Sequence, residues 1–323
     1  DGDRSLDVIT ANPNSDSVGL FLGDGRGGLQ PEVMIPTGNT PYGVAAADID
    51  GDGRLDLATA NFNDNTVSLL RATGRGTFAG PVPLPAGGKA FGVAFADWNG
   101  DGRPDLAVTN NNADSISVRF NDGTGAFKAQ ATYPVCKRPE SILSGDWNGD
   151  GRLDIAVVCP GVNAIDTFLN AGAAFGSSVR LDSPADLGGA VAFDLDHDGK
   201  LDLVGATSRS SGSQLGGGIA LFQGKGDGTF AKPVLRSPDA YSTRLTVGDF
   251  NGNGQPDLAA VTWYGFVSVL LTDGFTDAQP RVYRTSAKTV AIASGDMDGD
   301  GKVDIVTASD ASTINVLFNT CHM

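Results

Sequence analysis

The chain has 323 residues, of which 40% are hydrophobic and 45 are glycine, a composition typical of a folded protein with many tight turns. Its formal net charge of −15 disfavours nucleic acid and anionic membrane surfaces as partners. No apolar run is long enough to cross a bilayer, so we expect no membrane insertion.

An aspartate-rich stretch recurs from the N-terminus onward. Its full form, DIDGDGRLD, spans residues 48–56, and later copies begin at Asp97, Asp146, Asp194, Asp249 and Asp296. The first residues, DGDRSLD, match this stretch from its third position and make a seventh, partial copy. Copies that are 47 to 55 residues apart indicate an internal structural repeat.

Each repeat reads as four β-strands, which we label A to D. In the second repeat they are residues 43–47 (GVAAA), 55–60 (LDLATA), 65–70 (NTVSLL) and 81–85 (PVPLP), with a glycine-rich turn at residues 74–78. Seven such repeats predict an all-β fold, a seven-bladed β-propeller with four-stranded antiparallel blades. We expect residues 1–323 to form this single domain, with the aspartate-rich stretch as the A–B turn of each blade.

The strand count is uneven at the two ends of the chain. Seven B and seven C segments are present, but six A and six D segments. We therefore expect that one D and one A strand before residue 1 are missing from this chain, and that they complete the last and first blades. In the fifth repeat, the longer spacing is explained by a polar insertion, residues 207–218, between strands B and C.

The A–B turns carry the pattern of a calcium loop. Aspartates at loop positions 1, 3, 5 and 9 converge on one point, glycines at positions 4 and 6 permit the curvature, and the carbonyl of position 7 points inward. Hard oxygen ligands in flexible loops favour Ca²⁺ over Mg²⁺, and soft ligands for zinc or copper are absent from the pattern. The loop differs from an EF-hand because position 12 of the second copy is Thr59 rather than glutamate.

We predict six or seven Ca²⁺ sites. The candidate ligands are Asp1, Asp3 and Asp7; Asp48, Asp50, Asp52, Arg54 and Asp56; Asp97, Asn99, Asp101, Arg103 and Asp105; Asp146, Asn148, Asp150, Arg152 and Asp154; Asp194, Asp196, Asp198, Lys200 and Asp202; Asp249, Asn251, Asn253, Gln255 and Asp257; and Asp296, Asp298, Asp300, Lys302 and Asp304. Seven divalent ions would bring the formal charge from −15 to −1. The loop at residues 249–257 keeps two carboxylates and should bind most weakly.

These repeats resemble the FG-GAP family, with its bacterial VCBS-type relatives and the calcium-loop blades of integrin α-subunits. Residues 91–110, FGVAFADWNGDGRPDLAVTN, carry the Phe-Gly pair, the loop and the following strand. The Gly-Ala-Pro element is replaced by sequences such as TAN and VTN, which places the chain nearer the bacterial-type repeats. The resemblance implies extracellular recognition, adhesion or carbohydrate binding by a calcium-stabilised module; the alternative is a polysaccharide lyase on the same scaffold.

We expect a glycan or protein ligand on the face opposite the calcium loops. Trp263 and Tyr264 are adjacent in the shortest B–C turn. Because adjacent aromatic residues in a turn cannot both point into one strand face, at least one of them should reach the surface, although local packing would also explain the pair. Tyr42, Arg138 and Arg244 come from D–A turns on the same face. With two histidines, His197 in a loop and His322 in the tail, no Ser-His-Asp arrangement is expected.

Cysteine positions indicate a disulfide. Folding the fourth A–B hairpin about its loop pairs residue 141 with 159, which brings Cys159 within a few residues of Cys136. Cys321 would then remain free. A disulfide and calcium loops both suit an oxidising exterior, so we expect a secreted, cell-surface or periplasmic protein that acts as a monomer.

Overall fold

The computed structural model describes residues 1–172, 174–208, 218–236, 242–262, 264–272, 281–285 and 288–320. The chain divides into two compact units, which we describe separately. The first unit comprises residues 1–23 and 29–181, and the second comprises residues 24–28 and 182–323.

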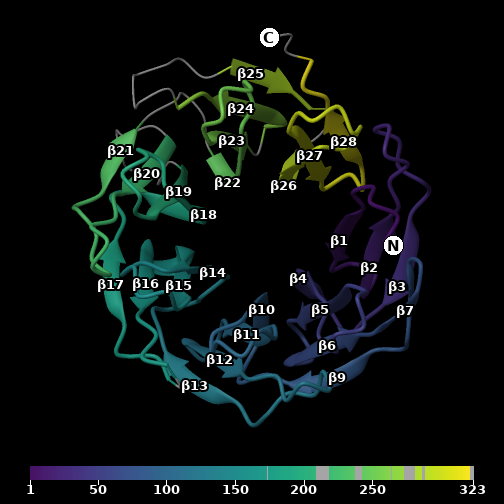
Figure 1. The fold of residues 1–323 in the computed structure, drawn as a ribbon, viewed down its shortest axis with the longest axis horizontal. Helices are drawn as coiled ribbons and strands as arrows, with labels where there is room; N and C mark the ends of the chain where they lie inside the picture. The colour runs from purple at the N-terminus through teal and green to yellow at the C-terminus, as the bar shows by residue number, and fades with distance from the viewer. Residues whose placement is uncertain are drawn as a thin grey trace. The chain divides into compact units, whose positions relative to one another are not determined.

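The first unit contains four antiparallel sheets, the blades one to four (Figure 1). Blade one is β1 (Val8–Asn12), β2 (Ser17–Phe21) and β3 (Val33–Pro36); blade two is β4 (Pro41–Ala47), β5 (Asp56–Asn61), β6 (Thr66–Leu70) and β9 (Val82–Pro85), with a small β7 (Ala72–Gly74) and β8 (Thr77–Phe78) hairpin between the last two. Blade three is β10 (Ala90–Ala96), β11 (Asp105–Asn110), β12 (Ser115–Arg119) and β13 (Ala131–Pro134), and blade four is β14 (Ser141–Gly145), β15 (Asp154–Cys159), β16 (Ala164–Phe168) and β17 (Val179–Asp182).

The second unit contains three antiparallel sheets, the blades five to seven. Blade five is β18 (Asp186–Phe193), β19 (Asp202–Ser208), β20 (Gly218–Phe222) and β21 (Val234–Arg236); blade six is β22 (Ser242–Gly248), β23 (Asp257–Thr262), β24 (Phe266–Leu270) and β25 (Arg281–Arg284). Blade seven is β26 (Thr289–Gly295), β27 (Asp304–Ser309) and β28 (Ile314–Leu317).

This element order confirms the predicted fold class, an all-β, seven-bladed β-propeller. The strands of every sheet follow chain order, and the aspartate-rich stretch joins strands A and B of blades two to seven. Within the described ranges, blade one shows strands B, C and D, and blade seven shows A, B and C, as the uneven strand count predicts. The insertion of the fifth repeat falls between β19 and β20; its residues 209–217 lie outside the described residues.

The helical content of the described residues is one short 3-10 helix, Pro160–Val162, between β15 and β16. No helix in the described part of the chain has the length and apolar character needed to span a membrane.

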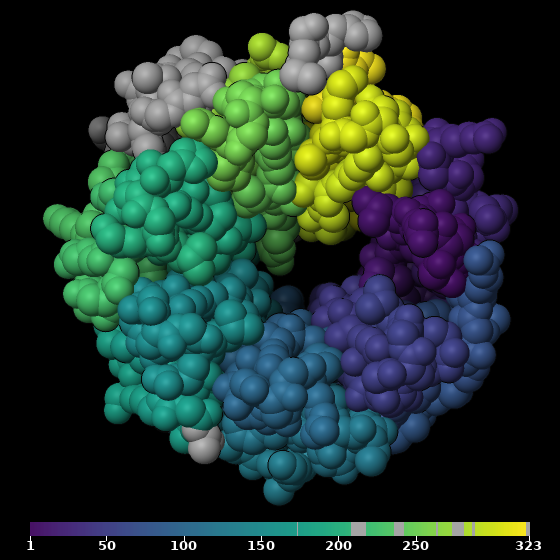
Figure 2. All heavy atoms as spheres, in the orientation of Figure 1, coloured from purple at the N-terminus to yellow at the C-terminus, as the bar shows by residue number. Residues whose placement is uncertain are grey.

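The core of each unit lies between consecutive blades. One cluster joins blades three and four through residues such as Trp98, Ile116 and Ile155, and another joins blades five and six through Leu195, Leu221 and others. Figure 2 shows the atoms of neighbouring blades within each unit in contact. Apolar burial between blades therefore stabilises the stacking of the repeats.

A glycine lets neighbouring A strands approach closely. A Cβ placed on Gly92 of β10 would lie 2.2 Å from the carbonyl oxygen of Glu140, immediately before β14. The pairing of β10 with β11 shifts register between Ala90 and Val93, so this glycine lies in a β-bulge. Gly43 of β4 has the same relation to Phe91 and the same kind of register shift. The glycine of the Phe-Gly pair is therefore required by the packing of one blade on the next.

The predicted disulfide is present. Cys136, in the D–A turn before β14, is bonded to Cys159 at the end of β15, and the two Cα atoms are 5.9 Å apart. The predicted hairpin register was wrong by one residue, because Ser141 pairs with Val158 rather than with Cys159. Cys321 lies outside the described residues.

Candidate functional site

Each A–B turn is here called an Asp loop. Its first aspartate accepts hydrogen bonds from the backbone N–H groups of the loop. In blade two, Oδ1 of Asp48 accepts hydrogen bonds from the N–H groups of Gly51 (2.8 Å) and Asp52 (3.1 Å), and Oδ2 accepts one from Gly53 (2.8 Å). The loops that begin at residues 97, 146, 249 and 296 repeat all three bonds. Gly51 and Gly53 have φ angles of 75° and 83°, a left-handed conformation that glycine adopts readily. The fifth loop has His197 at position 4 with a φ of 59°.

The aspartate at position 9 joins three parts of its blade. In blade two, Oδ2 of Asp56 accepts the N–H of Ile49 at loop position 2, and Oδ1 accepts the N–H of Ala72 after strand C. The equivalent side chains in the other loops make the same two contacts; they belong to Asp105, Asp154, Asp202, Asp257 and Asp304. All six are fully or almost fully buried. Burial raises the pKa of Asp56, Asp154 and Asp202, and it raises the pKa of Asp105 to about 6.

The residue at loop position 2 is buried in every described loop. These side chains are Ile49, Trp98, Trp147, Leu195, Phe250 and Met297. In three blades an asparagine after strand C also binds the neighbouring loop at this position: the amide of Asn121 donates to the carbonyl of Ile49 at 2.8 Å, and Asn170 and Asn319 donate likewise to Trp98 and Phe250. Position 2 therefore serves packing between blades, which explains why every full copy has a bulky apolar residue there.

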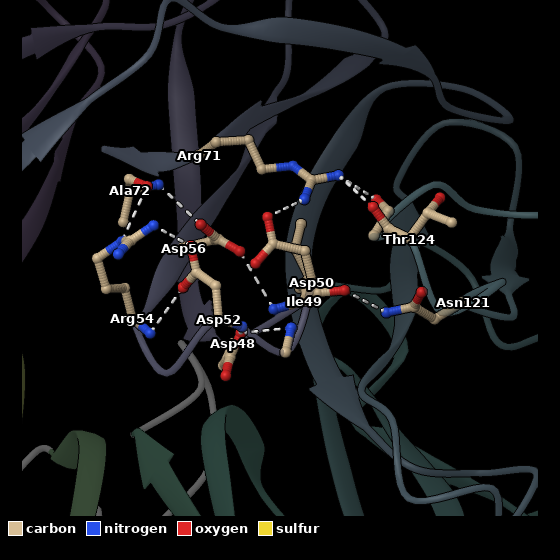
Figure 3. Close-up of polar contacts among 12 residues, drawn as sticks. Asp48, Ile49, Asp50, Asp52, Arg54, Asp56, Arg71, Ala72, Asn121 and Thr124 are labelled. Atoms are coloured by element: carbon tan, nitrogen blue, oxygen red, sulfur yellow. Dashed lines mark hydrogen bonds and ion pairs between the residues drawn. The ribbon is translucent and has the colours of Figure 1, made fainter. Parts of the chain in front are cut away.

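Three Asp loops bring carboxylates together. Oxygen atoms of Asp48, Asp50 and Asp56, of Asp194, Asp196 and Asp202, and of Asp296, Asp298 and Asp300 lie within 4.8 Å of one another in each set. Figure 3 shows the carboxylates of Asp50 and Asp56 directed toward each other. Oδ1 of Asp50 is buried and has no hydrogen-bond partner among the described residues. These are the three loops that the sequence predicts to offer four carboxylates each.

The basic residue at position 7 pairs with the aspartate at position 5. Arg54 contacts Asp52, and Arg152 and Lys302 reach Asp150 and Asp300 at 2.6 and 2.9 Å. The Lys302 ammonium lowers the pKa of Asp300. Such exposed pairs add little to stability, but they balance part of the charge of each loop.

The sixth loop keeps the loop shape with fewer charges. The N–H of Asn253 donates to the Asn251 side chain at 3.0 Å, and the N–H of Gln255 donates to that of Asn253 at 2.8 Å. Amide oxygens thus replace the carboxylates at positions 3 and 5 as acceptors. In the partial first loop, Oδ1 of Asp1 and of Asp3 accept hydrogen bonds from the N–H groups of Asp3 and Ser5 in the same way.

A family model for FG-GAP-like repeats matches six overlapping segments, residues 1–59, 48–108, 97–157, 146–205, 194–260 and 249–307. The chain belongs to the FG-GAP-like repeat family. FG-GAP repeats typically bind calcium. No curated protein matches the chain.

Solved structures share the fold of this FG-GAP protein at low sequence identity. BBS1N, in complex with ARL6DN, is 13% identical, with a TM-score of 0.69 over 99% of this chain and 90% of that one. A lectin from Agrocybe aegerita, described for its recognition of non-reducing terminal N-acetylglucosamine, is 19% identical, with a TM-score of 0.61 over 97% and 90%. The Pan2 WD40 domain of Neurospora crassa is 9% identical, with a TM-score of 0.60 over 98% and 89%.

The Asp loops of this FG-GAP chain fit the calcium that the family implies. The donors are carboxylate and amide oxygens, which suit a hard divalent cation. A carboxylate oxygen that accepts one N–H, such as Oδ2 of Asp48 at position 1 or either oxygen of Asp56 at position 9, retains a lone pair for a metal ion. The buried Oδ1 of Asp50, which has no hydrogen-bond partner among the described residues, gives the strongest support for a cation ligand role, because buried polar atoms in native proteins are almost always satisfied.

Sequence reasoning missed a second set of contacts at position 3. The Arg71 guanidinium, directly after strand C of blade two, donates to Oδ2 of Asp50 at 2.6 Å and to the carbonyl of Gly125 in blade three at 2.7 Å (Figure 3). In blade five, Gln223 at the equivalent position donates to Asp196. The same position is apolar in the other blades, where it holds Leu22, Phe120, Leu169, Leu271 and Phe318. The sequence feature that could have predicted these contacts is a polar residue at a repeat position that is apolar in the other blades.

The candidate ligand residues lie away from the Asp loops. The prediction that Tyr42 and Arg244 lie in D–A turns was wrong, because Tyr42 is in β4 and Arg244 is in β22, where each A strand begins earlier than predicted. Tyr42 and Tyr264 are 45% and 69% exposed, and Arg138 is also exposed. Arg244 is half-buried, and its guanidinium donates to the carbonyls of Gly188 and Thr243, so it links β22 to β18. Trp263 lies outside the described residues. Tyr264 thus satisfies the expectation that one aromatic side chain of its turn reaches the surface.

Proposed function

We propose that this chain is a calcium-stabilised recognition or adhesion module that binds a glycan or a protein at the turns opposite its Asp loops. The observation that carries the proposal is that the two ends of the blades present different side chains. At the Asp-loop end, the carboxylates are occupied with loop backbone, neighbouring strands and the expected cation. At the other end, aromatic side chains are exposed, such as Tyr42 at the start of β4 and Tyr264 in a hydrogen-bonded turn.

Calcium has a structural role in this proposal. Positions 1, 3, 5 and 9, with the carbonyl of position 7, would hold six or seven ions, whose charge offsets the repulsion among the aspartates. The four-carboxylate loops of blades two, five and seven would bind more tightly than the sixth loop, which has two carboxylates. A titration in which the sixth loop fills first would contradict this order.

Two features support the proposed cellular location. The Cys136–Cys159 disulfide is stable in oxidising compartments, and calcium is abundant outside cells. Both support a secreted, surface-displayed or periplasmic protein, here taken to act as a monomer.

Two of the structures with this fold provide precedents. The Agrocybe aegerita lectin recognises a terminal sugar, and BBS1N forms a complex with another protein. A lyase would need a tyrosine with two basic groups at one point. Around Tyr42 the described contacts include one basic group, Lys89, whose ammonium lies 4.3 Å from the centroid of the Phe62 ring. The structure thus provides no observation that favours cleavage over recognition.

A glycan array probed with the purified chain, in calcium and in EDTA, tests the proposal. We expect binding to one or a few related glycans in calcium and its loss in EDTA. A parallel assay for unsaturated products tests the lyase alternative. Product formation, or the absence of both glycan and protein ligands in calcium, would overturn the proposal.

A further inference from the structure

An aromatic platform occurs in the first unit, at the end of blades two and three opposite their Asp loops. The Tyr42 ring, at the start of β4, is stacked on the Phe91 ring, at the start of β10, with centroids 4.7 Å apart and an interplanar angle of 13°. The ring of Phe62, in the B–C turn of blade two, stands perpendicular to Tyr42 at 5.4 Å. Tyr42 nevertheless remains 45% exposed. One side of its ring is thus supported by Phe91, and much of the residue faces solvent.

The backbone that presents Tyr42 is strained and firmly held. Thr40 has a φ of 59°, a left-handed conformation that is unfavourable for a β-branched residue. Its N–H donates to Asp16 at 2.8 Å, its carbonyl accepts the N–H of Phe62 at 3.0 Å, and its hydroxyl accepts the Asn63 amide at 2.7 Å. Strained residues that are over-determined by their neighbours cluster at ligand sites. Here the same bonds fix the turn that carries Phe62 and Asn63 relative to Tyr42.

The polar groups around the rings are hydrogen-bond donors and acceptors rather than a single strong charge. The Lys89 ammonium lies over Phe62 and has no ion pair among the described residues. The Asn63 side chain is exposed, and its amide nitrogen donates a hydrogen bond to the Thr40 hydroxyl. The Asp64 carboxylate accepts the N–H of Asn39 at 2.6 Å. An exposed aromatic ring with amide, ammonium and carboxylate groups beside it can bind an apolar face that carries hydroxyl groups.

We propose that the Tyr42 platform, formed by Tyr42, Phe62, Phe91 and Lys89, binds a neutral pyranose unit of a glycan, which stacks its C–H face on the Tyr42 ring. A cationic ligand is disfavoured because Lys89 already occupies the face of Phe62. A polyanionic glycan is disfavoured by the net charge of −15 and by the carboxylates of Asp16 and Asp64 in the same turns. This inference rests on the proposed recognition function and specifies its site and ligand class.

One stacked sugar on a small, solvent-exposed platform implies weak binding, with a Kd of about 1 mM for a short oligosaccharide. The probes are cellotetraose, maltotetraose, xylotetraose and chitotetraose as neutral glycans, and trigalacturonate as the anionic comparison. Calorimetric titration in calcium measures binding to the wild-type chain and to Tyr42→Ala, Tyr42→Phe and Tyr283→Ala. The last variant removes a tyrosine of β25 that is 44% exposed, against 45% for Tyr42, and is the matched control.

We expect at least one neutral probe to bind, Tyr42→Ala to weaken it at least tenfold, and Tyr42→Phe and Tyr283→Ala to remain within threefold of wild type. Thermal melts show whether each variant is folded. If Tyr42→Ala does not fold, ¹³C-tyrosine labelling of the wild type provides the readout, since the Tyr42 ring signal should shift on titration and the Tyr283 signal should not.

Three results would overturn the inference. Glycan binding that Tyr42→Ala leaves intact would move the site elsewhere and leave the recognition function standing. Preference for trigalacturonate would overturn the ligand class. If no probe binds but a glycan array is positive, the platform falls while recognition stands; if the array is also negative, the glycan form of the proposed function falls with it.

Discussion

At the scale of single residues, the aspartate at loop position 9 has two roles. It holds the loop and the segment after strand C through hydrogen bonds, and it is a candidate calcium ligand. Asp105 accepts N–H groups from Trp98 and Asn121, which belong to the loop and to the segment after strand C. The same carboxylate is a candidate calcium ligand. Its loss should therefore affect the fold even when no metal is bound.

The variant Asp105→Asn tests the structural role in calcium-free protein. One of the two buried N–H groups would face the new amide NH₂, so we expect the free energy of unfolding to fall by about 2–3 kcal/mol at pH 7. The control is Asp122→Asn, because the exposed Asp122 accepts hydrogen bonds from Thr124 through one oxygen that asparagine retains. Urea denaturation in EDTA measures both. An equal, small effect of the two variants would contradict the assigned role.

The pH dependence of this difference has a definite sign. Burial raises the pKa of Asp105 to about 6 in the folded state, above the value of 3.8 for a free aspartate. Between these values the folded state binds the proton more tightly than the unfolded state, so the contribution of this group to stability decreases as pH rises through 6. Asp105→Asn lacks the titration. We expect the stability gap between wild type and variant to be larger at pH 5 than at pH 7 in EDTA; the opposite order would refute it.

Arg71 should weaken calcium binding in the second loop. Its guanidinium holds Oδ2 of Asp50, a predicted ligand, and it adds a positive charge beside the site. We expect Arg71→Leu to raise the calcium affinity of this loop about tenfold, since leucine restores the apolar residue found at this position in other blades. Calcium occupancy of each loop, measured by anomalous scattering at limiting calcium, checks it. Leu169→Met in blade four is the control, and unchanged occupancy of the second loop would count against the competition.

At the scale of elements, the contact between neighbouring A strands depends on a glycine. Gly92→Ala would place a methyl group 2.2 Å from the Glu140 carbonyl, so β10 and β14 must separate. We expect a loss of about 1–3 kcal/mol in unfolding free energy. Gly80→Ala is the control because a Cβ there meets nothing within 4 Å, and its φ is not left-handed. Thermal and urea unfolding measure both; a neutral Gly92→Ala would show that the strands can adjust.

The strands and Asp loops could be predicted because each follows from a local pattern that recurs seven times. The alternation in residues 65–70 and the aspartate spacing in residues 48–56 both have the same meaning in every copy. Contacts that occur between one pair of repeats and not the others could not be predicted in this way. The Arg71–Gly125 hydrogen bond and the Tyr42–Phe91 stack join different blades. No sequence pattern predicts the left-handed backbone conformation of Thr40. The contacts that form the candidate ligand site around Tyr42 are therefore not encoded by the repeated sequence pattern.

At the scale of the whole molecule, calcium should account for a large share of stability. Each ion at a hundredfold excess over its Kd contributes about 2.7 kcal/mol, so EDTA should lower the Tm by at least about 10 °C. Calcium should restore it, and magnesium at the same concentration should do so less well. Calorimetry also tests our proposal that residues 1–323 form one domain, which predicts one cooperative transition. Two separate transitions would contradict the single domain, and an unmoved Tm would contradict calcium stabilisation.

The asparagine that follows strand C has a consequence for how such a chain can evolve. The side-chain amides of Asn121 and Asn170 each donate to a backbone carbonyl in the loop of the preceding blade. The amide of such a repeat therefore makes this hydrogen bond only when the preceding repeat is present. Repeats three and four use the same pairing, and exchange or duplication between them would preserve it. Ala72 and Gly224 hold the corresponding place in repeats two and five and cannot supply the amide. Recombination should therefore be tolerated between some copies and not others, even where their strands are interchangeable.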